Sequence, residues 1–383
     1  MPYNVGKIFT TRNNMTHFHI LDLDTMGQGV AKADGQITFI AKTLPNEVVA
    51  AEVYRNKKNI HFAHMTEVLT PAPERQEAPC PHYAQCGGCD YQHVDYPTEL
   101  AFKQKSLRRH LRHFPDVDIT VHAAPQRWHY RNRIQLHYHA DKKVMGLMDV
   151  NYEPLPVQNC QLIQADVREK MLELYQDDAW LELLQDEPKR GHLELYCRDE
   201  EVQVSVNEPY ANGGFTQVFP HMNHYLTTWL THQVNQYVAD NAVIYDLFGG
   251  NGNLSLPLNR PTVVVDQYGE HTPQNNEHQS FVSQNLYAKD AIQRLQAAIP
   301  EDLNQPTCLI IDPPRSGLKN LKDFVATFKP KAVIFIACEP TSFVRDMATC
   351  LEHYTLMKVD LFDLFPATQH YETVGVLVLN ELV

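Results

Sequence analysis

The sequence of 383 residues predicts a multidomain α/β protein. Three observations support this prediction: short strands of alternating polarity near the N-terminus, a mixture of strands and helices in the middle, and buried apolar strands alternating with helices toward the C-terminus. We expect an OB-like β-barrel over residues 1–68, a mixed α+β central domain over residues 69–211 and a Rossmann-like domain over residues 212–383. A chain of this length can form two or three hydrophobic cores.

The N-terminal region has the pattern of a small barrel. Apolar and polar residues alternate in FHILDLD, ITFIAK, EVVAAEVYR and IHFAHMTEVL, and the turn signals MGQG, ADGQ and LPNE separate these segments. Short strands at this spacing are typical of a β-barrel of the OB type. The Pro-rich segment TPAPERQEAP that follows is expected to be a linker.

The central region combines helices, strands and a local excess of positive charge. Helices are expected in TELAFKQKSLRRHLRHF and ADVREKMLELYQDDAWLELLQ, and strands in RNRIQLHYH, KKVMGLMD, HLELYCR and EVQVSVN. Residues 101–133 contain eight Lys and Arg but only two acids, with aromatic residues interleaved. Such a mixture suits RNA phosphates and unstacked bases. From the charge run alone, however, a solvated amphipathic helix followed by a strand is the better explanation.

The C-terminal region predicts a doubly wound sheet. Four apolar strands end in residues with reactive or charged side chains, namely Asp246, Asp266, Asp312 and Cys338. A Gly-rich turn and the start of a helix are expected directly after the first of these strands. Ligands of such sheets bind at the carboxyl ends of the strands, so we expect the four residues at one edge.

Composition limits the class of protein. The chain is 43% hydrophobic but has no run of about 18 apolar residues, and its N-terminus lacks the apolar segment of a signal peptide. We therefore expect a cytoplasmic protein with no membrane partner. The net charge of −13 argues weakly against nucleic-acid binding by the chain as a whole. Eight cysteines are too few for a disulfide scaffold, so the spacing C-x5-C-x2-C in CPHYAQCGGC indicates metal ligands or a catalytic thiol.

The segment DLFGGNGN, which begins at Asp246, differs from the G-x-G-x-x-G of dinucleotide-binding enzymes. Its glycines allow the backbone to approach a ligand closely. The acid at the end of the following strand, Asp266, suits a ribose diol. Together these features fit S-adenosylmethionine better than NAD, because no pyrophosphate loop is needed. A plain tight turn is the alternative.

A lone cysteine on an apolar strand usually fills a core. Cys338 differs because Pro340 follows it and ends the strand, which should place the sulfur at the ligand edge of the sheet. The segment FPATQHYETVGVL then returns His370 and Glu372 directly before a final apolar strand. A thiolate and a carboxylate at the same edge form a nucleophile-and-base pair.

With these motifs, the chain resembles the RNA (uracil-5-)-methyltransferases, especially the 23S rRNA type that carries an N-terminal TRAM barrel. The resemblance covers nearly the whole length, and the cysteine spacing and the final motif are specific in combination. It includes LDLDTMGQGVAKADGQITFI, CPHYAQCGGC, GGFTQVF, DLFGGNGN, SQNL, DPPRSG, ACEP and FPATQHYET.

The resemblance implies methyl transfer from S-adenosylmethionine to C5 of a uridine in 23S rRNA through a covalent cysteine–C6 adduct. It implies Cys338 as the nucleophile, Glu372 as the base, and Asp312 as a group that holds the pyrimidine or the methyl donor. The implied donor site consists of Gln217, Phe248, Asn253, Asp266, Asn285 and Asp312. The target uridine must be single-stranded or flipped out. The basic segment is then expected to form an RNA surface, and the protein to act as a monomer.

The resemblance also implies a [4Fe–4S] cluster. Its ligands would be Cys80, Cys86, Cys89 and the distant Cys160, since thiolates are the usual cluster ligands. Zinc bound by four thiolates is the alternative that the spacing leaves open. We expect the cluster to shape the RNA-binding central domain rather than to perform redox chemistry.

The chain departs from the family pattern at several positions. Glu339 follows the cysteine where the family has Asn, and an inward-pointing carboxylate there would raise the thiol pKa. Phe219 replaces an Asn, Asp266 replaces a Glu, and the segment between Asp266 and Asn285 is short and polar, so a helix is doubtful there. Two alternatives follow: an RNA-binding protein that has lost catalysis, and a methyltransferase for the T-loop uridine of tRNA. The expected barrel and cluster favour rRNA, because the tRNA enzymes of the family generally lack both.

Overall fold

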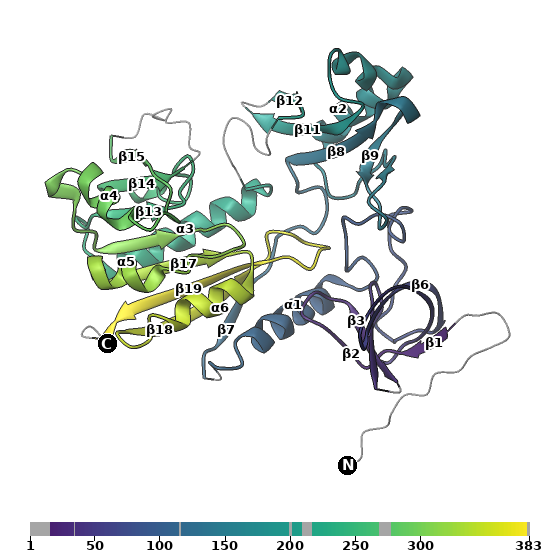
Figure 1. The fold of residues 1–383 in the computed structure, drawn as a ribbon, viewed down its shortest axis with the longest axis horizontal. Coiled ribbons are helices and arrows are strands. Elements are labelled where there is room, and N and C mark those ends of the chain that lie inside the picture. The colour runs from purple at the N-terminus through teal and green to yellow at the C-terminus, as the bar shows by residue number, and fades with distance from the viewer. Residues whose placement is uncertain are drawn as a thin grey trace.

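A computed structural model of the chain describes residues 16–33, 35–114, 116–198, 201–208, 217–267 and 277–380. Within these ranges the chain forms three sheets, which lie in three separate parts of the molecule (Figure 1). Of the helices in these ranges, none combines the length and the apolarity that crossing a membrane requires.

The N-terminal sheet has six strands in the order β1-β5-β6-β4-β3-β2. All neighbours are antiparallel except β4 and β6. The alternating pattern of the sequence places one face inward, where Phe18, Ile20 and Val49 belong to a small apolar core. The strands are β1 (Thr16–His19), β2 (Asp22–Leu23), β3 (Gly29–Ala33), β4 (Gln36–Ile40), β5 (Val48–Lys57) and β6 (Ile60–Thr70).

The central sheet is antiparallel, in the order β10-β9-β8-β11-β12. The helix α2 (Ala165–Tyr175) packs against it, and a 3-10 segment (Gln176–Leu184) continues the predicted helical stretch. Asp177 and Asp178 have positive φ angles there, which ends the α-helix. The strands are β8 (Arg133–His139), β9 (Val144–Met148), β10 (Pro154–Leu155), β11 (Arg190–Arg198) and β12 (Glu201–Val206), and a short 3-10 turn (Ala140–Lys142) joins the first two.

The C-terminal sheet has eight strands in the order β15-β14-β13-β16-β17-β19-β18-β7. The five strands from β15 to β17 are parallel, β19 runs antiparallel to both of its neighbours, and β7 is parallel to β18. The strands are β7 (Ile119–His122), β13 (Ile244–Leu247), β14 (Thr262–Asp266), β15 (Gln279–Ser283), β16 (Cys308–Ile311), β17 (Ala332–Ala337), β18 (Tyr354–Phe362) and β19 (Glu372–Leu379).

Helices cover both faces of this sheet, as the sequence predicts. The helix α3 (Pro220–Tyr237) packs on one face through Met222, Leu226 and Leu230. The other face is covered by α4 (Ala291–Ala298), α5 (Leu321–Phe328) and α6 (Pro340–Ala348). A short 3-10 turn (Glu301–Leu303) follows α4.

The prediction of a helix directly after the Gly-rich turn is wrong. The chain there makes turns and a short 3-10 segment (Leu256–Leu258). Pro257 and Pro261 lack the N–H group that a continuing helix needs, and Asn259 adopts a left-handed conformation with φ 48°. The longer helix of this part of the chain, α3, precedes the turn instead.

The central region also contributes to the C-terminal part of the molecule. The helix α1 (Tyr96–His110) lies between the N-terminal and C-terminal sheets (Figure 1). Asp95 caps its first turn by accepting a hydrogen bond from the Thr98 N–H at 2.9 Å, and basic residues occupy its last turn. Leu107 of α1 belongs to the same core as α6, and β7 completes the eight-stranded sheet.

Several cations of the basic segment are engaged within the protein, so the segment as a whole is not free for RNA, although its role as an RNA surface stays a prediction. Lys103, Arg127 and Arg133 are buried in ion pairs with carboxylates. Lys105 and Arg109 pair with Asp22 of the N-terminal sheet. Much of this positive charge therefore joins parts of the protein to one another.

Candidate active site

Four of the predicted residues lie at one edge of the C-terminal sheet because of how its strands run. The parallel strands β14, β16 and β17 end at or directly before Asp266, Asp312 and Cys338. The strand β19 runs in the opposite direction, so its first residue, Glu372, lies at the same edge. Ala337 pairs with Thr373, which places Cys338 and Glu372 next to each other on neighbouring strands.

A pocket of about 570 Å³ opens at this edge. All eight residues predicted for catalysis and donor binding contribute to its wall, including the Gln217 that precedes α3. They are Gln217, Phe248, Asn253, Asp266, Asn285, Asp312, Cys338 and Glu372. The structure thus brings these residues together, although their roles stay predictions.

The Gly-rich turn forms one wall of the pocket. Phe248 has a left-handed φ of 61°, a strained conformation for a residue with a bulky side chain. The Gly250 N–H donates a hydrogen bond to the Asp266 carboxylate at 3.1 Å. A Cβ atom on Gly249 would lie 2.7 Å from both the Asp246 carboxyl carbon and a Val264 methyl group. Only glycine therefore fits there without displacing its neighbours.

Tyr287 is a lining residue that the sequence analysis missed. Its ring lies 5.3 Å from that of Phe248, and its hydroxyl donates to the carbonyl of Gly317 at 3.1 Å. The Tyr287 N–H also donates to the side chain of Asn285 at 2.9 Å, which orients that predicted donor-site residue. The available signal was an aromatic residue two positions after Asn285.

Two carboxyl groups lie at the base of the site: Asp312 in the pocket wall and Asp246 buried beneath it. Burial raises the pKa of Asp246 to about 7, against the opposing effect of a 2.6 Å hydrogen bond that it accepts from the Ser255 hydroxyl. Burial and the charge of Asp246 raise the pKa of Asp312 to about 7 as well. Within the described part of the chain, Oδ1 of Asp246 is buried and has no hydrogen-bond partner.

The candidate nucleophile and base also have raised pKa values. Burial, and then the neighbouring Glu372 and Asp312 carboxylates, raise the pKa of the Cys338 thiol to about 12. Burial raises the pKa of Glu372 well above its usual value, and Oε2 of Glu372 has no hydrogen-bond partner among the described residues. The thiol is therefore protonated at neutral pH when the pocket holds no ligand.

The two substitutions near these motifs have structural explanations. Glu339 does not point inward: its carboxylate caps α6 by accepting a hydrogen bond from the Thr341 N–H at 3.2 Å. Phe219 is buried and stacks on Tyr130 of the central region, with 4.7 Å between ring centroids. Phe219 therefore joins two regions of the molecule and is not part of the pocket wall.

The four predicted metal ligands lie around a second, smaller cavity. Cys80, Cys86, Cys89 and Cys160 all contribute to the wall of this cavity of about 50 Å³, which is otherwise mainly apolar. Burial raises the pKa of the last three of these thiols. Across the ranges that the structure describes, no group of three or more His, Cys, Asp or Glu side chains is arranged to hold a metal ion. The predicted ligand set therefore stays a prediction.

Comparisons with known proteins point to one family. The profile of the family described as tRNA (Uracil-5-)-methyltransferase matches residues 278–381. The chain is 27% identical, over 95% of its length and 96% of the relative, to the 23S rRNA (uracil(1939)-C(5))-methyltransferase RlmD of Pasteurella multocida. It is 26% identical to the protein of the same name from Shewanella sediminis, over 94% of this chain and 95% of the relative.

A solved structure has the same fold. The crystal structure of Pyrococcus abyssi tRNA (uracil-54, C5)-methyltransferase in complex with S-adenosyl-L-homocysteine superposes with a TM-score of 0.71 and 20% identity. The match covers 94% of this chain and 99% of the other. The predicted resemblance is therefore confirmed: the chain is similar along nearly its whole length to proteins named as 23S rRNA (uracil-C5)-methyltransferases, and the family profile matches its C-terminal part.

Proposed function

We propose that this protein transfers a methyl group from S-adenosylmethionine to C5 of a uridine in 23S rRNA. One observation carries the proposal: Cys338, Glu372 and Asp312 line the same pocket as the Gly-rich turn. The choice of 23S rRNA follows the relatives, whose names specify that RNA and of which this chain covers 95–96%.

The pocket suits the methyl donor. S-adenosylmethionine, when bound, supplies an electrophilic methyl group. Asp266 would accept hydrogen bonds from its ribose hydroxyls, and the close backbone approach at Gly249 and Gly250 leaves room beside that carboxylate. Phe248 and Tyr287 offer aromatic surfaces on the same wall. Asn253, held by hydrogen bonds of 2.9 Å to Asn223 of α3, offers a fixed amide.

The chemistry follows from the polarity of uracil, whose C5 is a poor nucleophile. The Cys338 sulfur adds to C6 and loses its proton, and the ring becomes an enolate with a nucleophilic C5. Asp312, with a pKa of about 7, is the neighbouring group suited to accept that proton near neutral pH. C5 would then take the methyl group from the sulfonium of S-adenosylmethionine, whose sulfur–methyl bond breaks to leave S-adenosylhomocysteine.

Glu372 completes the cycle. Its carboxylate removes the remaining proton from C5, the electron pair reforms the C5–C6 double bond, and the sulfur–C6 bond breaks to release Cys338. Because its pKa is raised, Glu372 is a stronger base than an exposed carboxylate whenever it is ionised. Because the ring must enter the pocket to reach the Cys338 sulfur, the target uridine must leave its stack.

We further propose that the N-terminal sheet is an OB-like TRAM barrel and that the cysteine-lined cavity holds a [4Fe–4S] cluster. Four thiols line one space of about 50 Å³, which is several times the volume that one water molecule needs. This space favours a multi-atom cluster over a single zinc ion. The cation of Arg131 also borders the cavity and would offset the negative charge of thiolates.

Two alternatives remain to be separated from this proposal. The tRNA target was disfavoured because tRNA enzymes generally lack the expected barrel and cluster, yet a structure named as a tRNA enzyme covers 94% of this chain. The fold therefore does not discriminate between the two RNAs. Loss of catalysis was suggested by Glu339 and by the short segment between Asp266 and Asn285. Glu339 caps a helix instead of facing the thiol, and residues 268–276 of the short segment lie outside the described residues.

The first test compares two cysteine variants. Cys338→Ala should abolish transfer of a labelled methyl group to unmodified 23S rRNA, whereas Cys350→Ala, which alters a buried cysteine outside the pocket, should retain it. Unmodified tRNA transcripts are assayed in parallel. Transfer to tRNA alone would replace the proposed substrate. RNA binding with no calorimetric binding of S-adenosylmethionine would support the non-catalytic alternative.

The second test addresses the cavity. The protein purified without oxygen should be brown and contain about four iron atoms per chain, the content of one [4Fe–4S] cluster. Cys86→Ser should lose most of this iron. The matched control is Cys197→Ser, since Cys197 lies in the central region but outside the cavity wall. Colourless wild-type protein that contains zinc would contradict the cluster assignment.

A further inference from the structure

The loop of residues 363–371 connects β18 to β19 and leads directly into the candidate base, Glu372. In Figure 1 the yellow segment before β19 extends out of its sheet toward the central region. The residues that hold this loop come from residues 90–130, more than 230 positions earlier in the chain. This connection is not required by the sheet itself.

A buried lysine forms the first part of the connection. Lys103 of α1 has no exposed surface, and its ammonium group lies 2.7 Å from carboxylate oxygens of both Glu99 and Asp363. It also donates to the carbonyl of Phe365 at 3.2 Å. Tyr96 adds a second contact by donating to the other oxygen of Asp363 at 2.8 Å. The start of the loop is therefore bound to one face of α1.

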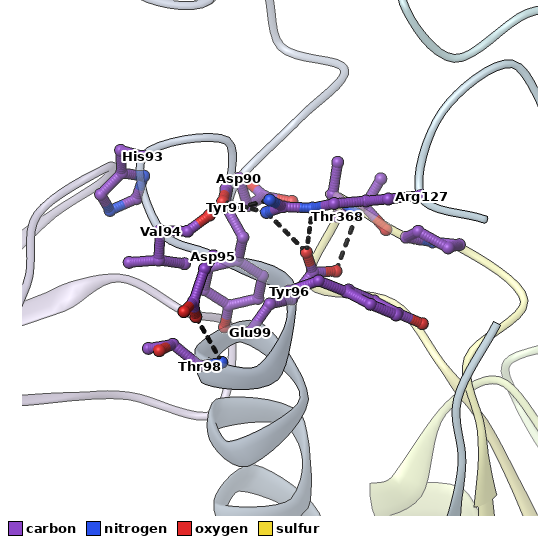
Figure 2. A network of polar contacts seen from close by, with 12 residues as sticks. Asp90, Tyr91, His93, Val94, Asp95, Tyr96, Thr98, Glu99, Arg127 and Thr368 are labelled. Atoms are coloured by element: carbon purple, nitrogen blue, oxygen red, sulfur yellow. Dashed lines mark hydrogen bonds and ion pairs between the residues drawn. The ribbon is translucent and has the colours of Figure 1, made fainter. Parts of the chain in front are cut away.

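Glu99 forms the second part. Its Oε1 accepts a hydrogen bond from the Ala367 N–H at 2.7 Å, in the middle of the loop. Arg127 donates to the other oxygen of Glu99 and to the carbonyls of Tyr91 and Val94. Figure 2 shows the Glu99 carboxylate at the top of α1, between Arg127 and the segment that contains Thr368. Each oxygen of this buried carboxylate thus has a partner.

The third part lies beside the cysteine segment. The N–H groups of Asp90 and Tyr91 both donate to the carbonyl of Ala367, at 2.9 and 3.1 Å. The Asp90 carboxylate accepts from the Gln369 N–H at 2.9 Å. The Tyr130 hydroxyl donates to the carbonyl of Pro366 at 3.0 Å. The central region therefore fixes the loop backbone up to three residues before Glu372.

Stability alone does not explain why these groups are charged. Two carboxylates and two cations buried together often stabilise a protein no more than well-packed apolar side chains would. Hydrogen bonds and ion pairs are directional, however, so they fix the position of the groups that they join. Here they are made to the backbone N–H groups of Ala367 and Gln369, which lead to Glu372.

We propose that Lys103 and Glu99 are positioning residues, which hold the 363–371 loop so that Glu372 faces the ring bound by Cys338. This inference rests on the proposed function. If Glu372 is misplaced, removal of the C5 proton slows, whereas attack by Cys338 depends on the neighbouring strand β17 and is affected less. The methylated covalent adduct between the protein and RNA should then accumulate.

The experiment uses four variants of the full chain. Lys103→Met removes the central cation, and Lys103→Met/Asp363→Asn removes it while keeping the cluster neutral, so that loss of folding and loss of positioning can be separated. Glu372→Gln shows the adduct expected when the base is absent. Arg260→Met is the matched control, since Arg260 is a buried cation that bonds to Asn235 and Ala239, away from the loop.

Each variant is incubated with an unmodified 23S rRNA transcript and S-adenosylmethionine, and the adduct is measured on a denaturing gel. We expect both Lys103 variants to lower kcat roughly 100-fold with an unchanged KM for the donor, and to accumulate adduct as Glu372→Gln does. Arg260→Met should keep the wild-type ratio of adduct to product. Lys103 variants that lose turnover without excess adduct would overturn the inference.

A second measurement does not depend on activity. In Glu99→Gln the Ala367 N–H loses a charged acceptor, so its hydrogen exchange should become at least about tenfold faster than in wild type. An unchanged exchange rate would overturn the inference even if the enzyme is active as proposed. If wild-type protein and Glu372→Gln neither methylate nor trap RNA, the proposed function fails; fast exchange in Glu99→Gln then still shows that Glu99 holds the loop, without a catalytic role.

Discussion

Buried carboxyl groups occur in two regions of this molecule, and their surroundings differ. Around Lys103, the carboxylates of Glu99 and Asp363 have cations and N–H groups within hydrogen-bond distance. In the pocket wall, Glu372 keeps one buried oxygen without a partner among the described residues, and Asp246 does so beneath the pocket. The first arrangement satisfies its charges within the protein and specifies a geometry. The second leaves a polar group of Glu372 beside the space that a ligand would fill, and such groups are typical of functional sites.

The pKa shifts follow this division only for the cation. The two carboxylates around Lys103 outweigh the effect of its burial, so its pKa is raised and its charge is kept. Burial raises the pKa of Glu99 in the same cluster, although Lys103 and Arg127 oppose that shift. At the pocket, burial raises the pKa of the lining Asp312, and of Asp246 beneath it, to about 7. These acids can therefore change protonation state near neutral pH, as proton transfer requires.

The largest expected effect on stability comes from breaking the satisfied cluster. Lys103→Met should lower the free energy of unfolding by roughly 3–5 kcal/mol, because it leaves buried carboxylates with one cation instead of two. Urea denaturation measures the change. Lys103→Met/Asp363→Asn should recover part of the loss. A loss below about 1 kcal/mol in the single variant would show that the cluster is not effectively buried.

An effect of similar size, but spread over about three pH units, should appear beneath the pocket as the pH changes. Between about pH 4 and pH 7 the folded protein keeps a proton on Asp246 that the unfolded chain has released, so this group's contribution to stability is lost as the pH rises. One such proton corresponds to about 1.4 kcal/mol per pH unit. Asp246→Asn removes it. The unfolding free energy of wild type should therefore fall relative to that of Asp246→Asn from pH 4 to pH 7.

Thermal or urea unfolding at several pH values gives this difference directly. It cancels the titration of groups that do not interact with Asp246, whereas Asp312, whose pKa depends on the charge of Asp246, contributes to the difference. A wild-type protein that gains stability relative to Asp246→Asn as the pH rises would contradict the assignment. It would indicate that a cation or hydrogen-bond donor compensates the carboxylate.

The smallest effect is expected at the exposed part of the same basic segment. Lys105 pairs with Asp22 at 2.8 Å, but both side chains remain about half exposed. Lys105→Ala should therefore change the unfolding free energy by no more than about 1 kcal/mol. Comparison with Lys103→Met, two residues away on the same helix, tests whether burial causes the difference in unfolding free energy. If both variants lose a similar amount of unfolding free energy, burial does not distinguish Lys103 from Lys105.

Much of the pocket could be predicted from the sequence, for a physical reason. Apolar strands that end in Asp266, Asp312 and Cys338 must present those residues at one sheet edge once the strands are parallel. The predicted strands of the central and C-terminal regions are present, and the helices lie on both faces of the eight-stranded sheet. Tyr287 was missed because no local pattern distinguishes a lining aromatic residue from a surface one.

Other features depend on contacts between distant residues. The basic run around Lys103 suggested an RNA surface. The sequence could not show that Lys103 is paired, because a charge pattern does not reveal that this cation meets Asp363, 260 positions later in the chain. The orientation of Glu339 could not be decided until α6 provided an N–H group for it to cap. The addition of β7 to the C-terminal sheet likewise depends on pairing with β18.

The sequence by itself determined the alternation of strands and helices, the residues at the strand ends and the family resemblance, because these depend on local periodicity and on motifs. Only the tertiary structure decided which charges are satisfied internally and which are left for a ligand. That difference arises from burial and from partners far apart in the chain, and it separates the cluster at Lys103 from the pocket at Cys338.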